Sequence, residues 1–149
     1  MADLNFEEER ISFTPMILYM EYINLQYARY LKENFKEITV GDATYLINIF
    51  YHQNISQREL ADMLFVSEPN VTQIIKRLEK NGFVERKVDE KNKSRRNLIL
   101  TNKGRVTVFS LIKVFYEGES ELYEKYTEEQ IELFKNMLYD YSNLAIKDI

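Results

Sequence analysis

The sequence predicts a mainly α-helical protein with one small β-hairpin. Apolar residues recur at the spacing of an amphipathic helix through most of the 149 residues, and several of these stretches begin with a helix-capping pattern. One pair of short stretches instead alternates apolar and polar residues on either side of a polar run, which is typical of a hairpin. The 45% hydrophobic composition is ordinary for a packed globular domain.

Two helices are expected in the N-terminal part of the chain. Thr14 and Pro15 form a start signal, a capping residue followed by a proline at the first helical position, and the apolar spacing continues to about Phe35. The apolar and aromatic stripe of this helix is wider than one neighbour needs, so we expect it to have two neighbours. A second helix is expected after Thr39 and ends near Asn54.

Two shorter helices with a tight turn between them follow. The pattern Ser-Gln-Arg-Glu that starts at Ser56 is a capping box, which predicts a helix from Gln57 to Leu64. After a break at residues 65–66, Ser67 is expected to cap a helix that runs to residue 81. Gly82 supplies the left-handed residue that ends it.

The alternating stretches, residues 83–88 and 97–100, are expected to form a hairpin with a polar tip at residues 89–96. A further helix starts at Thr101, and a last helix follows a second capping box at Thr127. Two short helices with a tight turn, followed by a hairpin, make a winged helix-turn-helix.

The second short helix has the composition of a helix that contacts DNA. Ile74, Ile75 and Leu78 gather on one face, which we expect to be buried. The opposite arc carries amide, ammonium, guanidinium and methyl groups, which are the groups that contact base edges and phosphates. The candidate DNA-binding residues are Ser67, Pro69, Asn70, Thr72, Gln73, Lys76, Arg77 and Lys80. The alternative is an ordinary solvated helix face.

The charge distribution also indicates a segment that contacts DNA. Residues 56–105 hold twelve Lys and Arg against seven Asp and Glu, a net charge of +5 within a chain whose net charge is −4. Such asymmetry is typical of a module that binds a polyanion. A cationic hairpin tip can reach the minor groove, and the candidate residues there are Arg86, Lys91, Lys93, Arg95 and Arg96. The alternatives are a solvated loop, or a winged-helix module that docks an acidic protein partner.

Several motifs occur together with a joint spacing. They are Ser56-Gln57-Arg58-Glu59-Leu60-Ala61, Val71-Thr72, residues 77–86, and Leu100-Thr101-Asn102-Lys103-Gly104. With them, residues 38–104 resemble the MarR family of winged-helix transcriptional regulators. The resemblance implies a single domain in which residues 37–104 form the DNA-binding region and residues 1–36 and 105–149 form a helical dimerisation region. It also implies a homodimer on a palindromic operator in double-stranded DNA, typically a repressor released by a small aromatic acid.

The terminal segments carry more apolar side chains than one winged domain can cover, which agrees with a dimer. They are Ile11, Phe13 and Ile17 at one end and Leu133, Phe134, Met137, Leu138, Tyr141, Leu144 and Ile146 at the other. We also expect Ala145 on the apolar face of the last helix.

The wing departs from the family pattern. The family usually has an Asp-Arg-Arg element eight residues before the Leu-Thr pair, and the matching residues here are Asn92-Lys93-Ser94. The usual Asp-to-Arg clamp is therefore expected to be missing. Arg95 and Arg96 lie just beyond, on what we expect to be a mobile tip, and either could enter the minor groove.

No catalytic or metal-binding pattern stands out. The four glycines are scattered, there is one histidine, and there is no cysteine, so we expect no enzyme activity, no cofactor and no metal site. The absence of cysteine and of a recognisable targeting segment favours a cytoplasmic protein. No apolar run approaches the about 20 residues that span a bilayer, so no membrane contact is expected.

The chain contains eleven tyrosines, and some of them fall near one another on the first two helices. We expect Tyr19, Tyr22, Tyr45, Tyr51 and His52 to be the candidate ligand-binding residues. One interpretation is packing in the dimer core, with the hydroxyls at its edges. The other is a cleft that holds a planar, weakly acidic aromatic ligand.

Overall fold

A computed structural model describes residues 14–144 of the chain. The chain divides into two compact units, Met1–Val108 and Phe109–Ile149, and the division falls inside one helix. Within residues 14–144, no helix combines the length and the apolar character needed to cross a membrane.

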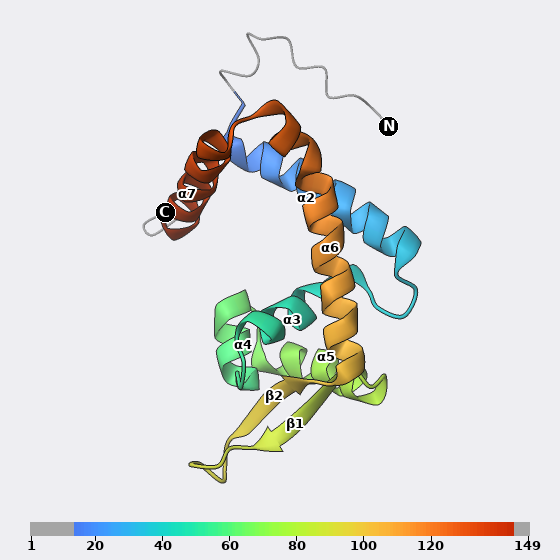
Figure 1. Ribbon diagram of the computed structural model, residues 1–149. Helices are drawn as coiled ribbons and strands as arrows, with labels where there is room; N and C mark the ends of the chain where they lie inside the picture. Colours follow the sequence, from blue (N-terminus) through green and yellow to red (C-terminus); the bar gives the residue numbers. More distant parts are fainter. Residues whose placement is uncertain (1–13, 145–149) are drawn as a thin grey trace. The chain divides into compact units, whose positions relative to one another are not determined.

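The first unit contains the predicted winged helix-turn-helix (Figure 1). Its elements are α2 (Met16–Asn34), α3 (Val40–Tyr51), α4 (Gln57–Leu64), α5 (Glu68–Lys80), β1 (Val84–Val88), β2 (Arg96–Leu100) and the first turns of α6 (Asn102–Lys125). The mainly helical fold with a small two-stranded wing is therefore confirmed.

Helix boundaries differ from the prediction at two places. Helix α2 has Pro15 as its N-cap rather than its first helical residue, and no side chain caps it. Helix α3 stops at Tyr51, short of Asn54, because the chain turns there and Asn54 takes a left-handed φ of 63°. The start of α3 is a capping box of Thr39 and Asp42, which adds to the predicted Thr39 start.

The helix-turn-helix follows the predicted pattern closely. The Ser56 backbone N–H donates to the Glu59 carboxylate at 2.8 Å, and the Glu59 N–H donates to the Ser56 hydroxyl at 3.2 Å, which completes the capping box of α4. Helix α4 ends at Phe65, which adopts the left-handed conformation and turns the chain toward α5. Ser67 occupies the N-cap position of α5, but its side chain makes no capping hydrogen bond.

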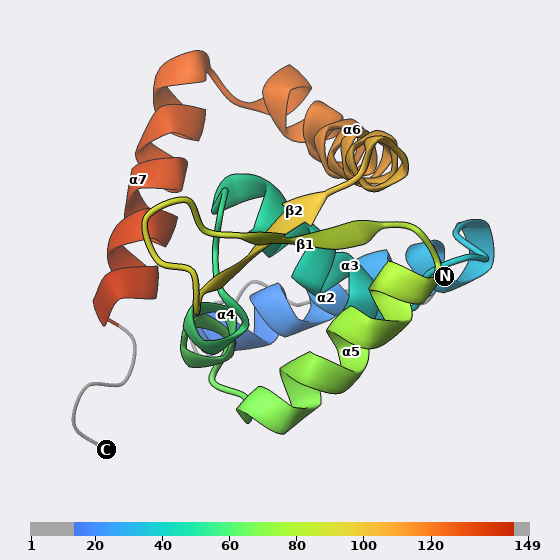
Figure 2. The same cartoon turned by 90° about the horizontal axis from the view of Figure 1, so that it is seen from below.

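The core of this unit lies between α3, α4, α5 and the hairpin. Val71, Ile75 and Leu78 of α5 are buried, whereas Ile74 is only half-buried, so the apolar face is narrower than predicted. Phe83 is fully buried just after α5. Seen from below, α5 and the hairpin lie side by side, so both can face the same ligand (Figure 2).

The hairpin is attached to the start of α4 as well as to itself. Its register pairs Val84 with Leu100 and Val88 with Arg96. One further bridge joins Ser56 to Asn97, and the Leu98 N–H donates to the Ile55 carbonyl at 2.8 Å. The segment before α4 therefore pairs with β2 and attaches the hairpin to the helix-turn-helix.

The second unit consists of the rest of α6 and helix α7 (Glu128–Leu144). The predicted capping box is present: the Thr127 N–H donates to the Gln130 side chain at 2.9 Å and the Gln130 N–H to the Thr127 hydroxyl at 3.2 Å. Ile131, in the first turn of α7, is buried. The predicted interface residues Ile11, Phe13, Ala145 and Ile146 lie outside the described residues.

Helix α6 begins where the chain passes very close to the end of α5. The Thr101 hydroxyl donates to the Gly82 carbonyl at 2.6 Å and accepts from the Gly104 N–H at 3.0 Å. A Cβ atom at Gly104 would lie 2.1 Å from the Phe83 carbonyl oxygen. Since that oxygen belongs to the backbone, it cannot rotate away, and only glycine fits.

Replacing Gly104 by alanine is expected to lower the free energy of unfolding by at least about 2 kcal/mol, because backbone must move to admit the methyl group. Gly41→Ala is the matched control: its new Cβ would meet only the Thr39 hydroxyl, at 3.7 Å. That variant should match or exceed the stability of the wild type, since alanine favours a helix by about 1 kcal/mol over glycine. Urea denaturation of both variants tests this, and equal effects would contradict it.

Candidate nucleic-acid interface

The exposed arc of α5 consists of side chains that can read DNA. Its exposed members are Pro69, Asn70, Gln73, Lys76, Arg77 and Lys80, with Ser67 at the N-cap. Among the described residues, Asn70, Gln73, Lys76 and Lys80 form no side-chain hydrogen bond or ion pair. Their amides and ammonium groups are therefore available to a ligand.

Thr72 is the half-buried member of the predicted set. Its hydroxyl accepts a hydrogen bond from the Gln57 side chain at 2.9 Å and donates to the Glu68 carbonyl at 3.0 Å. The hydroxyl is thus occupied in joining α4 to α5. The base contact predicted for Thr72 uses its methyl group, not the hydroxyl, and stays a prediction.

Arg77 pairs with Asp42, an acid that was not predicted as a site residue. Its guanidinium pairs with one oxygen of the buried Asp42 carboxylate, while the other oxygen accepts the Thr39 N–H at 2.8 Å. The pair joins α5 to the start of α3. Arg77 therefore has a structural partner, and its predicted contact with DNA stays a prediction.

Arg86 of β1 is likewise turned toward the fold. Its guanidinium lies 3.1 Å from a carboxylate oxygen of Glu79 on α5. The side chain is only 29% exposed, so most of it is covered. This arginine braces β1 against α5, and a role in DNA contact remains a prediction.

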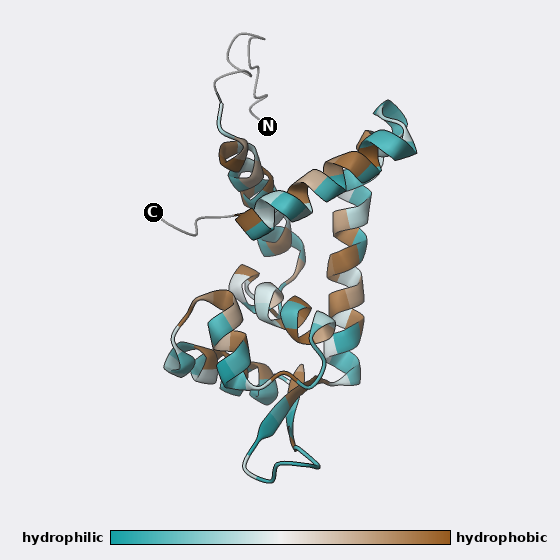
Figure 3. Ribbon diagram, turned by 90° about the vertical axis from the view of Figure 1, so that its left-hand side faces the viewer, coloured by the Kyte–Doolittle hydropathy of each residue, from teal (hydrophilic) through white to brown (hydrophobic). Residues whose placement is uncertain are grey.

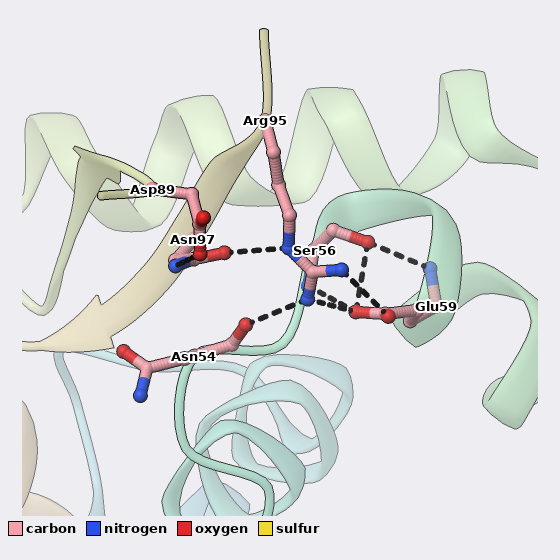
Figure 4. Close-up of polar contacts among 6 residues, drawn as sticks. All are labelled: Asn54, Ser56, Glu59, Asp89, Arg95 and Asn97. Atoms are coloured by element: carbon pink, nitrogen blue, oxygen red, sulfur yellow. Dashed lines mark hydrogen bonds and ion pairs between the residues drawn. The ribbon is translucent and has the colours of Figure 1, made fainter. Parts of the chain in front are cut away.

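The Arg95 guanidinium donates four hydrogen bonds (Figure 4). Its two terminal nitrogens donate to the two carboxylate oxygens of Glu59, at 3.0 and 2.7 Å. One of them also donates to the Asn54 carbonyl at 3.0 Å, and Nε donates to the side-chain oxygen of Asn97 at 2.8 Å. The expectation that Arg95 lies on a mobile tip is therefore wrong, because bidentate pairing holds the guanidinium in one orientation.

Asp89 extends this cluster into the hairpin loop. The buried Asn97 donates to one Asp89 oxygen at 2.9 Å, and the Lys91 and Asn92 N–H groups donate to the other at 2.9 and 2.8 Å. The clamp expected to be missing is thus replaced by Asp89, Asn97, Arg95 and Glu59. Asn92 only shapes the loop, by accepting from Ser94.

The remaining wing candidates point outward. Lys91, Lys93 and Arg96 are exposed, and the loop that carries them is hydrophilic throughout (Figure 3). Arg96 donates only to loop carbonyls, those of Lys93 at 2.8 Å and Arg95 at 3.3 Å. Since the guanidinium of Arg95 is occupied, Arg96 is the better placed of the two for a groove contact.

The clamp lowers the pKa of both of its acids. The Ser56 backbone N–H is the largest cause for the Glu59 pKa, and the Arg95 side chain is the next. For Asp89 the side chain of Asn97 lowers the pKa most, followed by the Asn92 and Lys91 N–H groups. Each acid stabilises the fold above its unfolded pKa of about 4, and the stabilisation is lost as the pH falls through the lower folded pKa.

The predicted ligand residues are spread over two helices. Tyr45 is buried on α3, and that burial raises its pKa. Tyr51 and His52 are exposed at the end of the same helix, and Tyr19 and Tyr22 are half-buried on α2. Tyr45 and Tyr51 lie on different faces of α3, so the five residues do not line one surface. Within residues 14–144, no group of three acids and histidines is arranged to hold a metal.

Several site residues were not found from the sequence. Asp42 pairs with Arg77, Asn97 accepts from Arg95, and Asp89 accepts from Asn97. Glu59 was identified only as a capping residue. The Arg77–Asp42 and Arg95–Glu59 partners are 35 and 36 residues apart, and no local pattern reveals such a pair.

Removing the Arg95 guanidinium should raise the Glu59 pKa only part of the way to its ordinary value, because the Ser56 N–H still binds the carboxylate. Arg96→Ala is the matched control and should leave the Glu59 pKa unchanged. Carboxyl titration by NMR in wild type and both variants measures this. A full return to the ordinary value in Arg95→Ala, or an equal shift in Arg96→Ala, would contradict the described clamp.

Comparison with known proteins agrees with this geometry. The model of the MarR family matches residues 38–95. The uncharacterized HTH-type transcriptional regulator YybA of Bacillus subtilis is 32% identical over 104 residues, which covers 69% of both chains.

Solved structures of MarR and MepR align with almost the whole chain. A crystal structure of MarR superposes with a TM-score of 0.69 at 24% identity, over 97% of this chain and 95% of that one. Staphylococcus aureus MepR bound to ethidium bromide gives a TM-score of 0.65 at 25% identity, over 93% and 96%. The winged helix-turn-helix, its exposed arc and these similarities together show that the chain belongs to the MarR family and is a DNA-binding regulator of transcription rather than an enzyme.

Proposed function

We propose that the protein is a repressor that binds a pseudo-palindromic operator as a homodimer. Each subunit would place α5 in the major groove and the hairpin tip over the adjacent minor groove. The observation that carries this proposal is the unpaired arc of α5, where Asn70, Gln73, Lys76 and Lys80 are exposed beside a hairpin with an outward-facing cationic loop. Amides pair bidentately with adenine, and ammonium groups contact guanine or phosphate.

The dimer is supported by apolar side chains left exposed on the terminal helices. They include Met16, Ile17, Ile23 and Leu25 on α2 and Leu133, Phe134, Met137 and Leu144 on α7. Isolated helices with such faces need a partner. The proposed dimerisation region is residues 1–36 and 105–149, and the proposed DNA-binding region is residues 37–104. An interface formed by such helices can bury more than about 2,000 Å².

The wing contributes mainly charge in this proposal. Lys91, Lys93 and Arg96 lie in the exposed loop, where they can approach a narrow minor groove. Arg86 and Arg95 act on the fold, through Glu79 and Glu59. The binding constant is therefore expected to fall steeply with salt, with a slope set by the outward-facing cations.

Gln73→Ala is expected to weaken binding to the preferred operator by about 1–3 kcal/mol and to leave random duplex almost unaffected, because the amide reads a base. Lys93→Ala combined with Arg96→Ala should weaken both duplexes and reduce the salt slope. The measurement is fluorescence anisotropy across a salt series, on a duplex selected by the wild-type protein from a random library.

Light scattering on the DNA-free protein should give twice the 17.9 kDa chain mass. Equal affinity of the wild type for selected and random duplex would contradict specific regulation and favour a protein partner for the basic arc. Gln73→Ala weakening both duplexes equally, while the double variant loses only the selected one, would reverse the roles of helix and wing.

A planar aromatic ligand is the proposed effector, and it would release the DNA. Two observations support it: Tyr51 and His52 are exposed at the end of α3, and Staphylococcus aureus MepR is bound to ethidium bromide in a similar structure. By linkage, a ligand that prefers the DNA-free form lowers DNA affinity by the factor by which DNA lowers ligand affinity.

The effector proposal predicts that some phenolic, benzoate-like or ethidium-like compound raises the melting temperature and weakens operator binding. Tyr51→Ala should reduce both effects for such a compound without changing operator binding in its absence. A panel that gives neither a thermal shift nor DNA release would assign the tyrosines to packing.

A further inference from the structure

Phe65, at the turn between α4 and α5, is the most exposed large apolar side chain among the described residues. It is 96% exposed, and its backbone adopts the left-handed conformation, with φ 53° and ψ 39°. The Val66 N–H donates to the Ala61 carbonyl at 3.1 Å, and the Phe65 N–H donates to the Asp62 backbone carbonyl at 3.4 Å. This is the helix ending in which the turning residue is ordinarily glycine.

Phenylalanine is an unfavourable choice here on two counts. A left-handed backbone costs a residue with a side chain about 1 kcal/mol or more. A fully exposed ring also gains nothing from burial in the fold. A bulky residue at positive φ is therefore an outlier that packing within the subunit does not explain, and such outliers concentrate at functional positions.

The position of Phe65 lies within the reach of a ligand bound to α5. Ser67, the N-cap of α5, follows two residues later, so the two Cα atoms are at most about 7.6 Å apart. Asn70 and Gln73, in the first turns of α5, belong to the arc proposed to read bases. A duplex that engages this end of α5 would cover the Phe65 ring as well.

The neighbours of Phe65 indicate which part of DNA it would meet. Asp62 and Glu68 are exposed on either side of it in the chain, and their carboxylates disfavour a close phosphate. The apolar surface of DNA consists of thymine methyl groups in the major groove and the edges of deoxyribose. Phenylalanine is one of the side chains that contact the thymine methyl.

We infer that Phe65 is a DNA-contacting residue outside the recognition helix, whose ring packs on an apolar surface of the operator. This inference rests on the proposed function. It adds a large apolar contact to an interface that the arc of α5 and the wing would otherwise make mainly through polar and charged groups.

The test compares Phe65→Gly, Phe65→Ala and Phe65→Tyr in the full-length protein, on the duplex selected by the wild type. Both Gly and Ala should weaken binding about tenfold, since both remove the buried ring area. Tyr keeps the ring and should bind within about twofold of the wild type. Meanwhile Phe65→Gly should melt no lower than the wild type, because glycine relieves the left-handed strain.

A Phe65→Gly variant that binds DNA as the wild type does would overturn the inference. So would a loss in Gly that Ala does not share, because that loss would come from backbone flexibility rather than from the ring. A change of oligomeric mass in either variant would also overturn it and would assign the ring to a second copy of the chain. Wild-type binding and the Gln73→Ala result test the proposed function separately, so failure of the two is distinguishable.

A duplex with deoxyuridine in place of thymidine distinguishes the two apolar surfaces. If the ring packs on thymine methyl groups, the loss of affinity caused by Phe65→Gly should shrink on the deoxyuridine duplex. On that duplex neither the wild type nor the variant has a methyl group to contact. If the ring packs on deoxyribose, the loss should be equal on both duplexes. Either result supports the contact.

Discussion

The carboxylate of Glu59 joins three parts of the domain at one point. It accepts the Ser56 N–H that starts α4, and it binds the guanidinium of Arg95 at the end of the wing loop. Arg95 in turn reaches Asn54 before α4 and Asn97 in β2. The wing therefore takes its orientation from the same group that defines the first turn of the helix-turn-helix. A wing held in this way presents its cations in a fixed direction relative to α5, which a freely moving loop could not do.

The basic residues of the central segment fall into two groups, those paired with an acid of the fold and those left exposed. Arg77, Arg86 and Arg95 pair with Asp42, Glu79 and Glu59, where a planar guanidinium can bind more than one acceptor. Lys76, Lys80, Lys91 and Lys93 are exposed, as are Arg58, Arg96 and Arg105. Lys103 is a lysine of the paired group, because its ammonium lies 3.2 Å from a Glu37 carboxylate oxygen. The number of basic residues in the segment thus overstates the cations available to DNA, because several of them are paired with acids of the fold.

Local patterns predicted the fold because each depends on residues close in sequence. The signals for the capping box at Ser56, the stop at Gly82 and the hairpin all act within a few residues, and each of these features is present. The exposed side of α5 followed from the same periodicity. What the sequence could not show were contacts between distant residues: Arg95 with Glu59, Arg77 with Asp42, and the backbone approach at Gly104. The charge of Arg95 was visible in the sequence, but whether it faced a groove or a carboxylate depended on the folded chain.

The side chains that would read DNA differ from those that hold the fold. The side chains of Asn70 and Gln73 form no hydrogen bond to another described residue, whereas the Thr72 hydroxyl links α4 to α5. Substitutions at Asn70 or Gln73 would therefore alter the proposed recognition surface and leave the hydrogen bonds of the domain in place. A duplicated gene with this architecture could acquire a new operator through a few surface changes while its stability stayed almost constant. The separation of the two sets of residues makes divergence of regulatory targets structurally simple.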